Sequence, residues 1–182
     1  VPSLPLAGYG VTLFFVISGF LITYLLLREI DKTDTVDIKK FYLRRILRIW
    51  PIYYLFILLS IIVLYYSGGI NDILVPELWY YIFFTANIPF VFHQGILLIV
   101  HYWSIGVEEQ FYLFWPWLVK FSKQKLLLTA VLFFLLFFLF KISSWILFGS
   151  ESYIYRFLIV FRFHCMMLGT VGAFLFFNIN KR

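Results

Sequence analysis

The stretch that decides the fold is LLLTAVLFFLLFFLFKISSWILF, residues 126–148, in which Lys141 is the one charged side chain. A helix needs about 20 predominantly apolar residues to cross the hydrocarbon core of a bilayer, and it satisfies its own backbone hydrogen bonds there. This stretch meets both demands, so the sequence predicts a transmembrane helix. From such a helix, Lys141 can extend its ammonium group toward the membrane interface.

The composition of the whole chain agrees with this prediction. Of its 182 residues, 63% are hydrophobic, 24% are aromatic and only 13% are charged, whereas a soluble domain has about 45–50% apolar and about 25% charged residues. A soluble protein of this size has too small a core to bury so much apolar surface. The same numbers exclude a disordered chain, a coiled coil and a disulfide-rich secreted scaffold.

Apolar runs occupy most of the chain, at roughly residues 4–27, 49–66, 76–100, 102–119, 126–148 and 157–177. The third run is interrupted near Asn87 and again at His93. We therefore predict an all-α, polytopic membrane helix bundle with five to six transmembrane segments. No internal repeat or Gly/Ser linker divides the chain, so residues 1–182 are expected to form a single membrane domain.

The distribution of Lys and Arg predicts the orientation, because cytoplasmic loops are enriched in these residues. Residues 28–48 carry seven of the fifteen, namely Arg28, Lys32, Lys39, Lys40, Arg44, Arg45 and Arg48. We expect this joint to be cytoplasmic and residues 67–76, which have none, to lie outside. Two alternatives remain for the rest: if 76–100 crosses once, Lys120, Lys123 and Lys125 lie outside, and if it is a re-entrant hairpin they lie inside. The net charge of +6 needs no nucleic acid as a partner.

The first polar cluster lies between Lys39 and Arg48, which holds five basic residues and no acid. On a helix, Arg48 shares a face with Arg44, four residues before it, and with Arg45, three residues before it. Several arginines on one face can clamp phosphates by bidentate hydrogen bonds. The alternative is a topology signal that contacts the headgroups of anionic lipids.

The second cluster places Glu108 and Glu109 inside an apolar run. A charged side chain in a membrane segment normally faces a partner or a cavity, because an isolated charge there is costly. Ser104, Glu108 and Tyr112 are spaced by four and would line one helix face, where they could hold a proton or orient a hydroxyl. The alternative is a segment at the membrane boundary whose carboxylates lie in headgroup water.

The third cluster is Arg162 and His164, in the last apolar run. Gly169 and Ala173 follow with the spacing of small residues that lets another helix approach closely. The alternative roles are structural: Arg162 pairs with Glu108 or Glu109, and His164 is a packing residue. Metal-ligand spacings, a Walker loop and a dinucleotide-binding loop are absent from the sequence, so we predict no metal site.

Four blocks of the chain carry a family resemblance. They are GVTLFFVISGF at 10–20, FYLRRILRIWP at 41–51, WSIGVEEQFY at 103–112, and Phe161-Arg162 followed by Gly169 and Ala173. In this order they resemble the acyltransferase 3 family of bacterial membrane acyltransferases. The resemblance implies an O-acyltransferase in the bacterial inner membrane, with multiple spans. It would move an acyl group, usually acetyl, from cytoplasmic acyl-CoA to a hydroxyl of a surface or lipid-linked sugar, such as lipopolysaccharide, peptidoglycan or another polysaccharide.

The resemblance also implies roles for particular residues. Arg45 and Arg48, with Arg44, would bind the phosphates of acyl-CoA, which is a co-substrate and not a cofactor. Glu108 matches the family's acidic residue in the Trp-Ser block and Arg162 its late membrane arginine. With Ser104 and Tyr112 they would support catalysis, and membrane lipids and the glycan acceptor would be the other partners.

The chain departs from the family pattern at two places. Where the family usually has Asp, this chain has Thr12. Related proteins also carry their catalytic histidine in a helix before the first block, which here would precede Val1. We therefore expect an incomplete middle portion of such an enzyme, inactive by itself.

Two functions of other classes fit the same residues. A transporter or flippase could use Glu108 and Arg162 as an intramembrane ion pair on a substrate path. A catalytically incomplete fragment could insert into the membrane or assist assembly without performing any chemistry.

Overall fold

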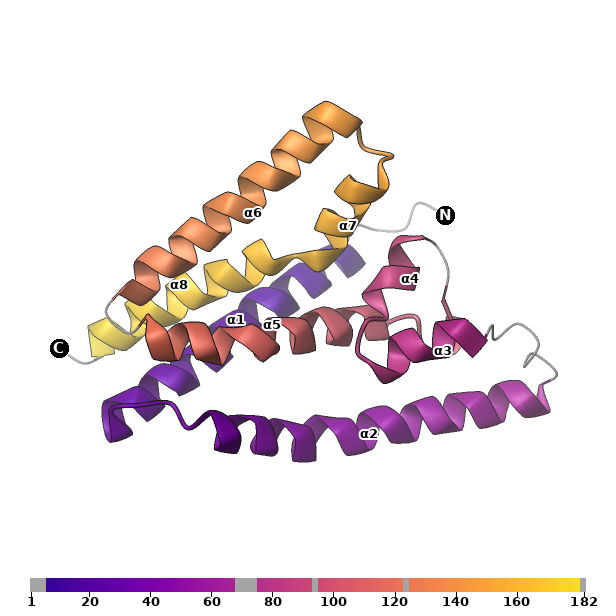
Figure 1. Cartoon of the computed structure of the whole chain (residues 1–182), viewed down its shortest axis with the longest axis horizontal. Coiled ribbons are helices and arrows are strands. Elements are labelled where there is room, and N and C mark those ends of the chain that lie inside the picture. The colour runs from indigo at the N-terminus through magenta and orange to yellow at the C-terminus, as the bar shows by residue number, and fades with distance from the viewer. Residues whose placement is uncertain (1–5, 68–74, 93–94, 123–124, 181–182) are drawn as a thin grey trace. The chain divides into compact units, whose positions relative to one another are not determined.

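The computed structural model describes residues 6–67, 75–92, 95–122 and 125–180, and all regular structure within these ranges is helical (Figure 1). The elements are α1 (Leu6–Thr33), α2 (Ile38–Tyr66), α3 (Val75–Ile82), α4 (Asn87–Val91), η2 (Leu97–Ile99), α5 (Tyr102–Phe121), α6 (Leu126–Phe148), α7 (Tyr153–Phe161) and α8 (Phe163–Asn180). The all-α fold class is thus confirmed.

Four of the described helical segments are long and apolar enough to cross a membrane: Gly8–Thr33, Ile38–Tyr66, Leu126–Phe148 and Tyr153–Asn180. The chain is therefore an integral membrane protein. The sequence predicts five to six spans, and the difference lies in two places. The run at 76–100 is divided among the short helices α3, α4 and η2, and α5, which carries Glu108 and Glu109, is not among the four.

Contacts divide the chain into two compact units. The terminal unit comprises Val1–Val36 and Phe111–Arg182, and the central unit comprises Asp37–Gln110. Helix α5 contributes its first half to the central unit and its second half to the terminal unit. Each unit has its own packing.

In the terminal unit, α1 and α8 pack closely because each helix has a glycine that lies against the backbone of the other. A Cβ atom on Gly169 would lie 1.9 Å from the carbonyl oxygen of Val16, and one on Gly19 would lie 2.0 Å from that of Met166. The two helices run parallel, side by side (Figure 1), since Arg162 bonds to Gly8 at one end and the rings of Tyr24 and Phe177 meet near the other. The small-residue spacing at Gly169 thus marks the surface on which α1 packs.

A series of buried hydrogen bonds joins α5, α1 and α8. The indole Nε1 of Trp115 donates to Thr23 Oγ1 at 2.9 Å, and the hydroxyls of Thr23 and Thr170 are 3.0 Å apart. All three side chains are fully buried. Because a buried polar group is costly unless it is hydrogen-bonded, these hydrogen bonds fix the second half of α5 against α1 and α8.

The central unit is built around the aromatic ring of Tyr53 on α2. This ring stacks on Phe84 and on Tyr102, with centroids 4.3 and 4.4 Å away. The hydroxyl of Tyr53 donates to the carbonyl oxygen of Tyr81 at 2.7 Å, and that of Tyr54 donates to the carbonyl oxygen of Ile82 at 2.9 Å. The end of α3 is therefore fixed to the middle of α2.

The packing of the central unit bears on the two alternatives for residues 76–100. Tyr102 lies beside Tyr53, and Glu109 lies beside Arg45, so α5 runs antiparallel to α2. The segment between them packs on α2 and does not form a spanning helix. Within the central unit, the first half of α5 thus returns beside α2, as the re-entrant alternative requires.

The close approach of α8 to α1 generates a stability prediction with an internal control. Replacing Gly169 with Ala should destabilise the protein by about 1–3 kcal/mol, because its Cβ must displace the backbone of α1. On the same helix, a Cβ on Gly172 meets only Phe20 Cδ2 at 3.6 Å, so Gly172→Ala should be neutral or stabilising through its helix propensity. Thermal unfolding in detergent measures both variants, and equal melting temperatures would contradict the packing.

The re-entrant segment generates a topology prediction. The single cysteine of the chain, Cys165, is buried, so cysteines introduced at exposed sites can be labelled selectively. In intact cells, a membrane-impermeant maleimide should modify Tyr66→Cys from outside, and should modify Lys125→Cys only after the membrane is permeabilised. Labelling of Lys125→Cys in intact cells would mean that residues 76–100 cross the membrane.

Candidate functional site: an arginine paired with two glutamates

The start of α2 places the three arginines of the first cluster on a helix. The apolar run begins near residue 49, but the helix begins eleven residues earlier, at Ile38, because Asp37 caps it. The carboxylate of Asp37 accepts a hydrogen bond from the backbone amide of Lys40 at 3.1 Å, and this bond lowers the pKa of Asp37. Arg44, Arg45 and Arg48 are therefore held on a regular helix and not in a loop.

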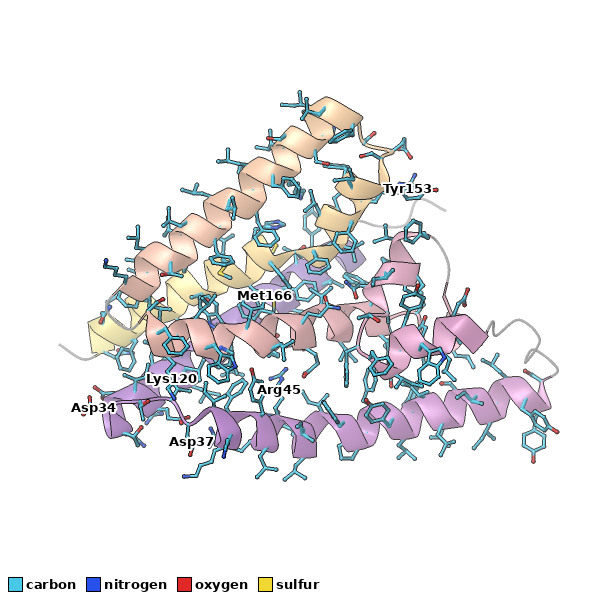
Figure 2. All side chains as sticks on the ribbon, in the orientation of Figure 1. Asp34, Asp37, Arg45, Lys120, Tyr153 and Met166 are labelled. Carbon is cyan, nitrogen blue, oxygen red and sulfur yellow. The ribbon has the colours of Figure 1, made fainter. Side chains whose placement is uncertain are left out.

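Arg45 pairs with the two carboxylates of α5. Its Nε donates to Glu109 Oε1 at 2.9 Å, and its Nη2 lies 3.9 Å from Glu108 Oε1. Figure 2 shows the Arg45 side chain extending from α2 toward α5. The three side chains are only 13–16% exposed. In such a setting each charge is stable only because the opposite charge lies beside it.

Arg44 and Arg48 differ from Arg45 in their surroundings. Both are exposed, whereas Arg45 is partly buried. By helix rotation, Arg48 lies about 40° from Arg44 and about 60° from Arg45, so exposure and not rotation alone separates Arg45 from the other two. The cluster therefore contains two arginines at the surface and one that joins α2 to α5.

A second polar group fixes the same part of α5. The side-chain amides of Gln110 and Asn87 bond to each other in both directions, at 2.9 and 3.3 Å. Gln110 Nε2 also donates to the carbonyl oxygen of Phe84 at 2.9 Å. A Cβ on Gly106 would lie 2.7 Å from that same oxygen. The part of α5 that carries Glu108 and Glu109 is thus held in two ways. Gly106 and Gln110 contact the backbone of Phe84, and Glu109 pairs with Arg45.

The predicted stripe of Ser104, Glu108 and Tyr112 is divided between the two units. Ser104 Oγ donates to the carbonyl oxygen of His101, the residue before α5, at 3.0 Å. Glu108 faces Arg45. Tyr112 is buried and lies in the half of α5 that belongs to the terminal unit.

Arg162 occupies a break in the last span of the terminal unit. It separates α7 from α8 and has a left-handed backbone conformation with φ of 41°. Its Nη1 donates to Thr12 Oγ1 at 2.6 Å and to the carbonyl oxygen of Gly8 at 3.0 Å. Thr12, where the family usually has Asp, thus supplies a neutral oxygen acceptor to this guanidinium group.

Sequence reasoning found these polar residues but did not pair them. Arg45 is 64 residues from Glu109, and Arg162 is 150 residues from Thr12. The usable signal for the first pair was the cost of two carboxylates in an apolar run, which requires a cation nearby. Asn87 gave no such signal, because in the sequence it marks only an interruption of the third run.

The comparisons with known proteins agree with the four sequence blocks. The family model for the acyltransferase 3 domain, described as "Acyltransferase domain", matches residues 1–182. The peptidoglycan O-acetyltransferase OatA of Listeria monocytogenes serovar 1/2a is 34% identical over 137 residues, which cover 68% of this chain and 22% of that protein. The O-acetyltransferase OatA of Staphylococcus aureus strain NCTC 8325 is 34% identical over 122 residues, covering 62% and 20%.

A putative O-acetyltransferase of Staphylococcus aureus strain COL is 37% identical over 117 residues, which cover 59% of this chain and 19% of the relative. The chain thus spans about a fifth of the length of these curated relatives. No solved structure matches it. Because the family model covers every residue from 1 to 182, the chain belongs to the acyltransferase 3 family.

Proposed function

We propose that the protein takes part in O-acetylation of a cell-surface glycan, with cytoplasmic acetyl-CoA as the donor. Family membership and the O-acetyltransferase names of the relatives support the reaction class. The Listeria relative is named for peptidoglycan, so we propose a hydroxyl of a cell-wall sugar as the acceptor. The observation that carries the proposal is the division of the arginine cluster into surface residues and an anchored one.

In this proposal, Arg44 and Arg48 bind the phosphates of the donor. They are exposed on one helix face, in the joint that the positive-inside rule assigns to the cytoplasm, where acetyl-CoA is present. Guanidinium groups bind phosphate by paired, charge-assisted hydrogen bonds. The ion pair of Arg45 with Glu109 fixes the rotation of α2 about its axis and so directs Arg44 and Arg48 outward.

The reaction exchanges a thioester for an ester. The hydroxyl oxygen of the acceptor attacks the acetyl carbonyl carbon, a C–O bond forms and the C–S bond to CoA breaks. The hydroxyl proton passes to a general base and the thiolate of CoA is protonated. The family resemblance implies a histidine upstream of the first block as that base. Within this chain, Glu108, Ser104, Tyr112 and Arg162 remain candidates for supporting roles.

The division of the arginines predicts different effects of their substitution. The double variant Arg44→Gln/Arg48→Gln should weaken binding of CoA by about 10–100-fold, because it removes charge-assisted contacts to phosphate. Arg45→Gln should lower the free energy of unfolding by up to about 3 kcal/mol, because it leaves Glu109 partly buried without its partner. Isothermal titration and thermal unfolding of the purified protein measure these effects.

The control is Lys40→Gln, at an exposed residue on the same helix, which pairs with Asp37 at the surface. It should change the stability by less than about 1 kcal/mol. Unchanged affinity for CoA in the Arg44/Arg48 variant would contradict the donor-site assignment, whatever the result for Arg45.

A second experiment tests the reaction itself. Membranes that contain the full protein should transfer label from radioactive acetyl-CoA to glycan as alkali-labile ester, and the Arg44→Gln/Arg48→Gln variant should lose at least nine-tenths of this transfer at low donor concentration. A transporter would instead move an already acetylated or unmodified substrate without consuming acetyl-CoA. Transport activity with no dependence on acetyl-CoA would therefore contradict the proposal.

A further inference from the structure

A small polar pocket lies between the end of α1 and the end of α8, in the terminal unit. It has a volume of about 290 Å³ and is lined by Tyr24, Arg28, Asp31, Lys32, Phe177 and Asn180. The four lining residues of α1 share one helix face, because they follow each other at intervals of four, three and one. None of the lining residues belongs to the arginine–glutamate site, so the pocket is a separate candidate for binding.

An aromatic ring positions the first cation of the pocket. The guanidinium carbon of Arg28 lies 5.9 Å from the centroid of the Tyr24 ring, within the distance at which a cation is attracted to an aromatic face. Tyr24 is fixed in turn, since its ring meets those of Phe176 and Phe177 edge-on at 5.8 and 6.3 Å. Because the contact with Tyr24 uses no hydrogen bond, the N–H donors of Arg28 remain available to a ligand.

The lining of the pocket is net positive, since Arg28 and Lys32 are cations and Asp31 is its one carboxylate. Among the residues that the structure describes, neither Arg28 nor Lys32 forms an ion pair. These two cations are one helical turn apart and can bind one phosphate by charge-assisted hydrogen bonds. The side-chain oxygens of Asp31 and Asn180 can accept hydrogen bonds from hydroxyls. The mixed lining therefore fits a phosphate ester that also carries hydroxyl groups.

The pocket lies at the depth of lipid headgroups. The first apolar run ends directly before Arg28, and the membrane-crossing segment Gly8–Thr33 has 26 residues. At about 1.5 Å per residue this segment is about 39 Å long, which exceeds the hydrocarbon core of about 30 Å. Its last turns therefore reach the headgroup layer, which is that of the cytoplasmic leaflet by the positive-inside rule.

Aromatic side chains continue from the pocket along the two helices. The ring of Tyr24, which lines the pocket, stacks on Phe20 one turn earlier at 6.1 Å, and Phe20 meets Phe176 at 5.9 Å. Phe176 is 46% exposed, so part of this aromatic group faces the surroundings. Tyr24 thus joins the polar pocket directly to apolar surface on which an acyl chain can lie.

We propose that this pocket binds the headgroup of an anionic phospholipid of the phosphatidylglycerol type. Arg28 and Lys32 contact its phosphate, Asp31 and Asn180 accept hydrogen bonds from its glycerol hydroxyls, and an acyl chain lies against Phe176. A zwitterionic lipid lacks the net negative charge that complements the lining. A free phosphate ester has that charge but no acyl chain to bury against the aromatic group. The site does not rest on the proposed acetyltransferase function.

Lipid retention by the purified full protein tests this site. The protein is incubated in detergent with phosphatidylglycerol, phosphatidylethanolamine or phosphatidylcholine of the same acyl chains, and bound lipid is counted by native mass spectrometry. We expect phosphatidylglycerol to be retained about tenfold better than either zwitterionic lipid. The double variant Arg28→Gln/Lys32→Gln should lose this preference, because one charge-assisted contact corresponds to about a tenfold change in affinity. The variant Arg28→Lys/Lys32→Arg, which keeps both charges, should preserve it.

Two further variants distinguish the pocket from surface charge in general. Lys125→Gln, at the exposed lysine that precedes α6, removes a charge outside the pocket and should retain lipid as the unmodified protein does. Tyr24→Leu keeps every charge but removes the ring beside Arg28. It should lower the retention of phosphatidylglycerol about twofold to fivefold, because the cation–π contact is lost.

Three results would overturn the proposal. The first is equal retention of the three lipids by the unmodified protein. The second is an Arg28→Gln/Lys32→Gln variant that retains phosphatidylglycerol as well as Lys125→Gln does. The third is displacement of phosphatidylglycerol by an equal concentration of soluble glycerol phosphate, which would assign the pocket to a free phosphate ester.

Discussion

The central constraint on this chain is the cost of charge in an apolar environment. Arg45 and Glu109 are each unfavourable alone among aromatic and aliphatic neighbours, and together they are stable at 2.9 Å. Because the pair connects α2 to α5, it sets how the central unit packs and which side of α2 faces outward. With α2 packed in this way, Arg44 and Arg48 are exposed at the surface. A structural interaction thus determines where a donor-binding surface can exist.

In the terminal unit, the charge of Arg162 is stabilised in a different way. Arg162 bonds to Thr12 and to the backbone oxygens of Gly8 and Ile159, and its left-handed conformation ends α7. Backbone contact at Gly19 and Gly169 holds α1 and α8 close enough for this bonding. The positive charge of Arg162 is thus stabilised by neutral oxygens and not by a carboxylate.

Sequence reasoning predicted the membrane class, the all-α fold and the family, because hydropathy and local blocks are properties of neighbouring residues. It placed the arginine cluster on a helix but gave no start for α2, since the polar first turns of that helix depend on the Asp37 cap and not on hydropathy. It did not predict that Arg45 pairs with Glu109, because three basic residues at helical spacing look alike until a partner 64 residues away is known. The single membrane domain and the catalytic roles stay predictions.

The most direct test of this account is a charge-reversal cycle on Arg45 and Glu109, read out as affinity for acetyl-CoA. Arg45→Glu and Glu109→Arg should each weaken donor binding, and the double variant should recover most of it, because the ion pair acts only by positioning α2. The coupling free energy should reach about 1–3 kcal/mol. If the double variant binds acetyl-CoA no better than Arg45→Glu does, Arg45 contacts the donor itself and the division of the arginines is wrong.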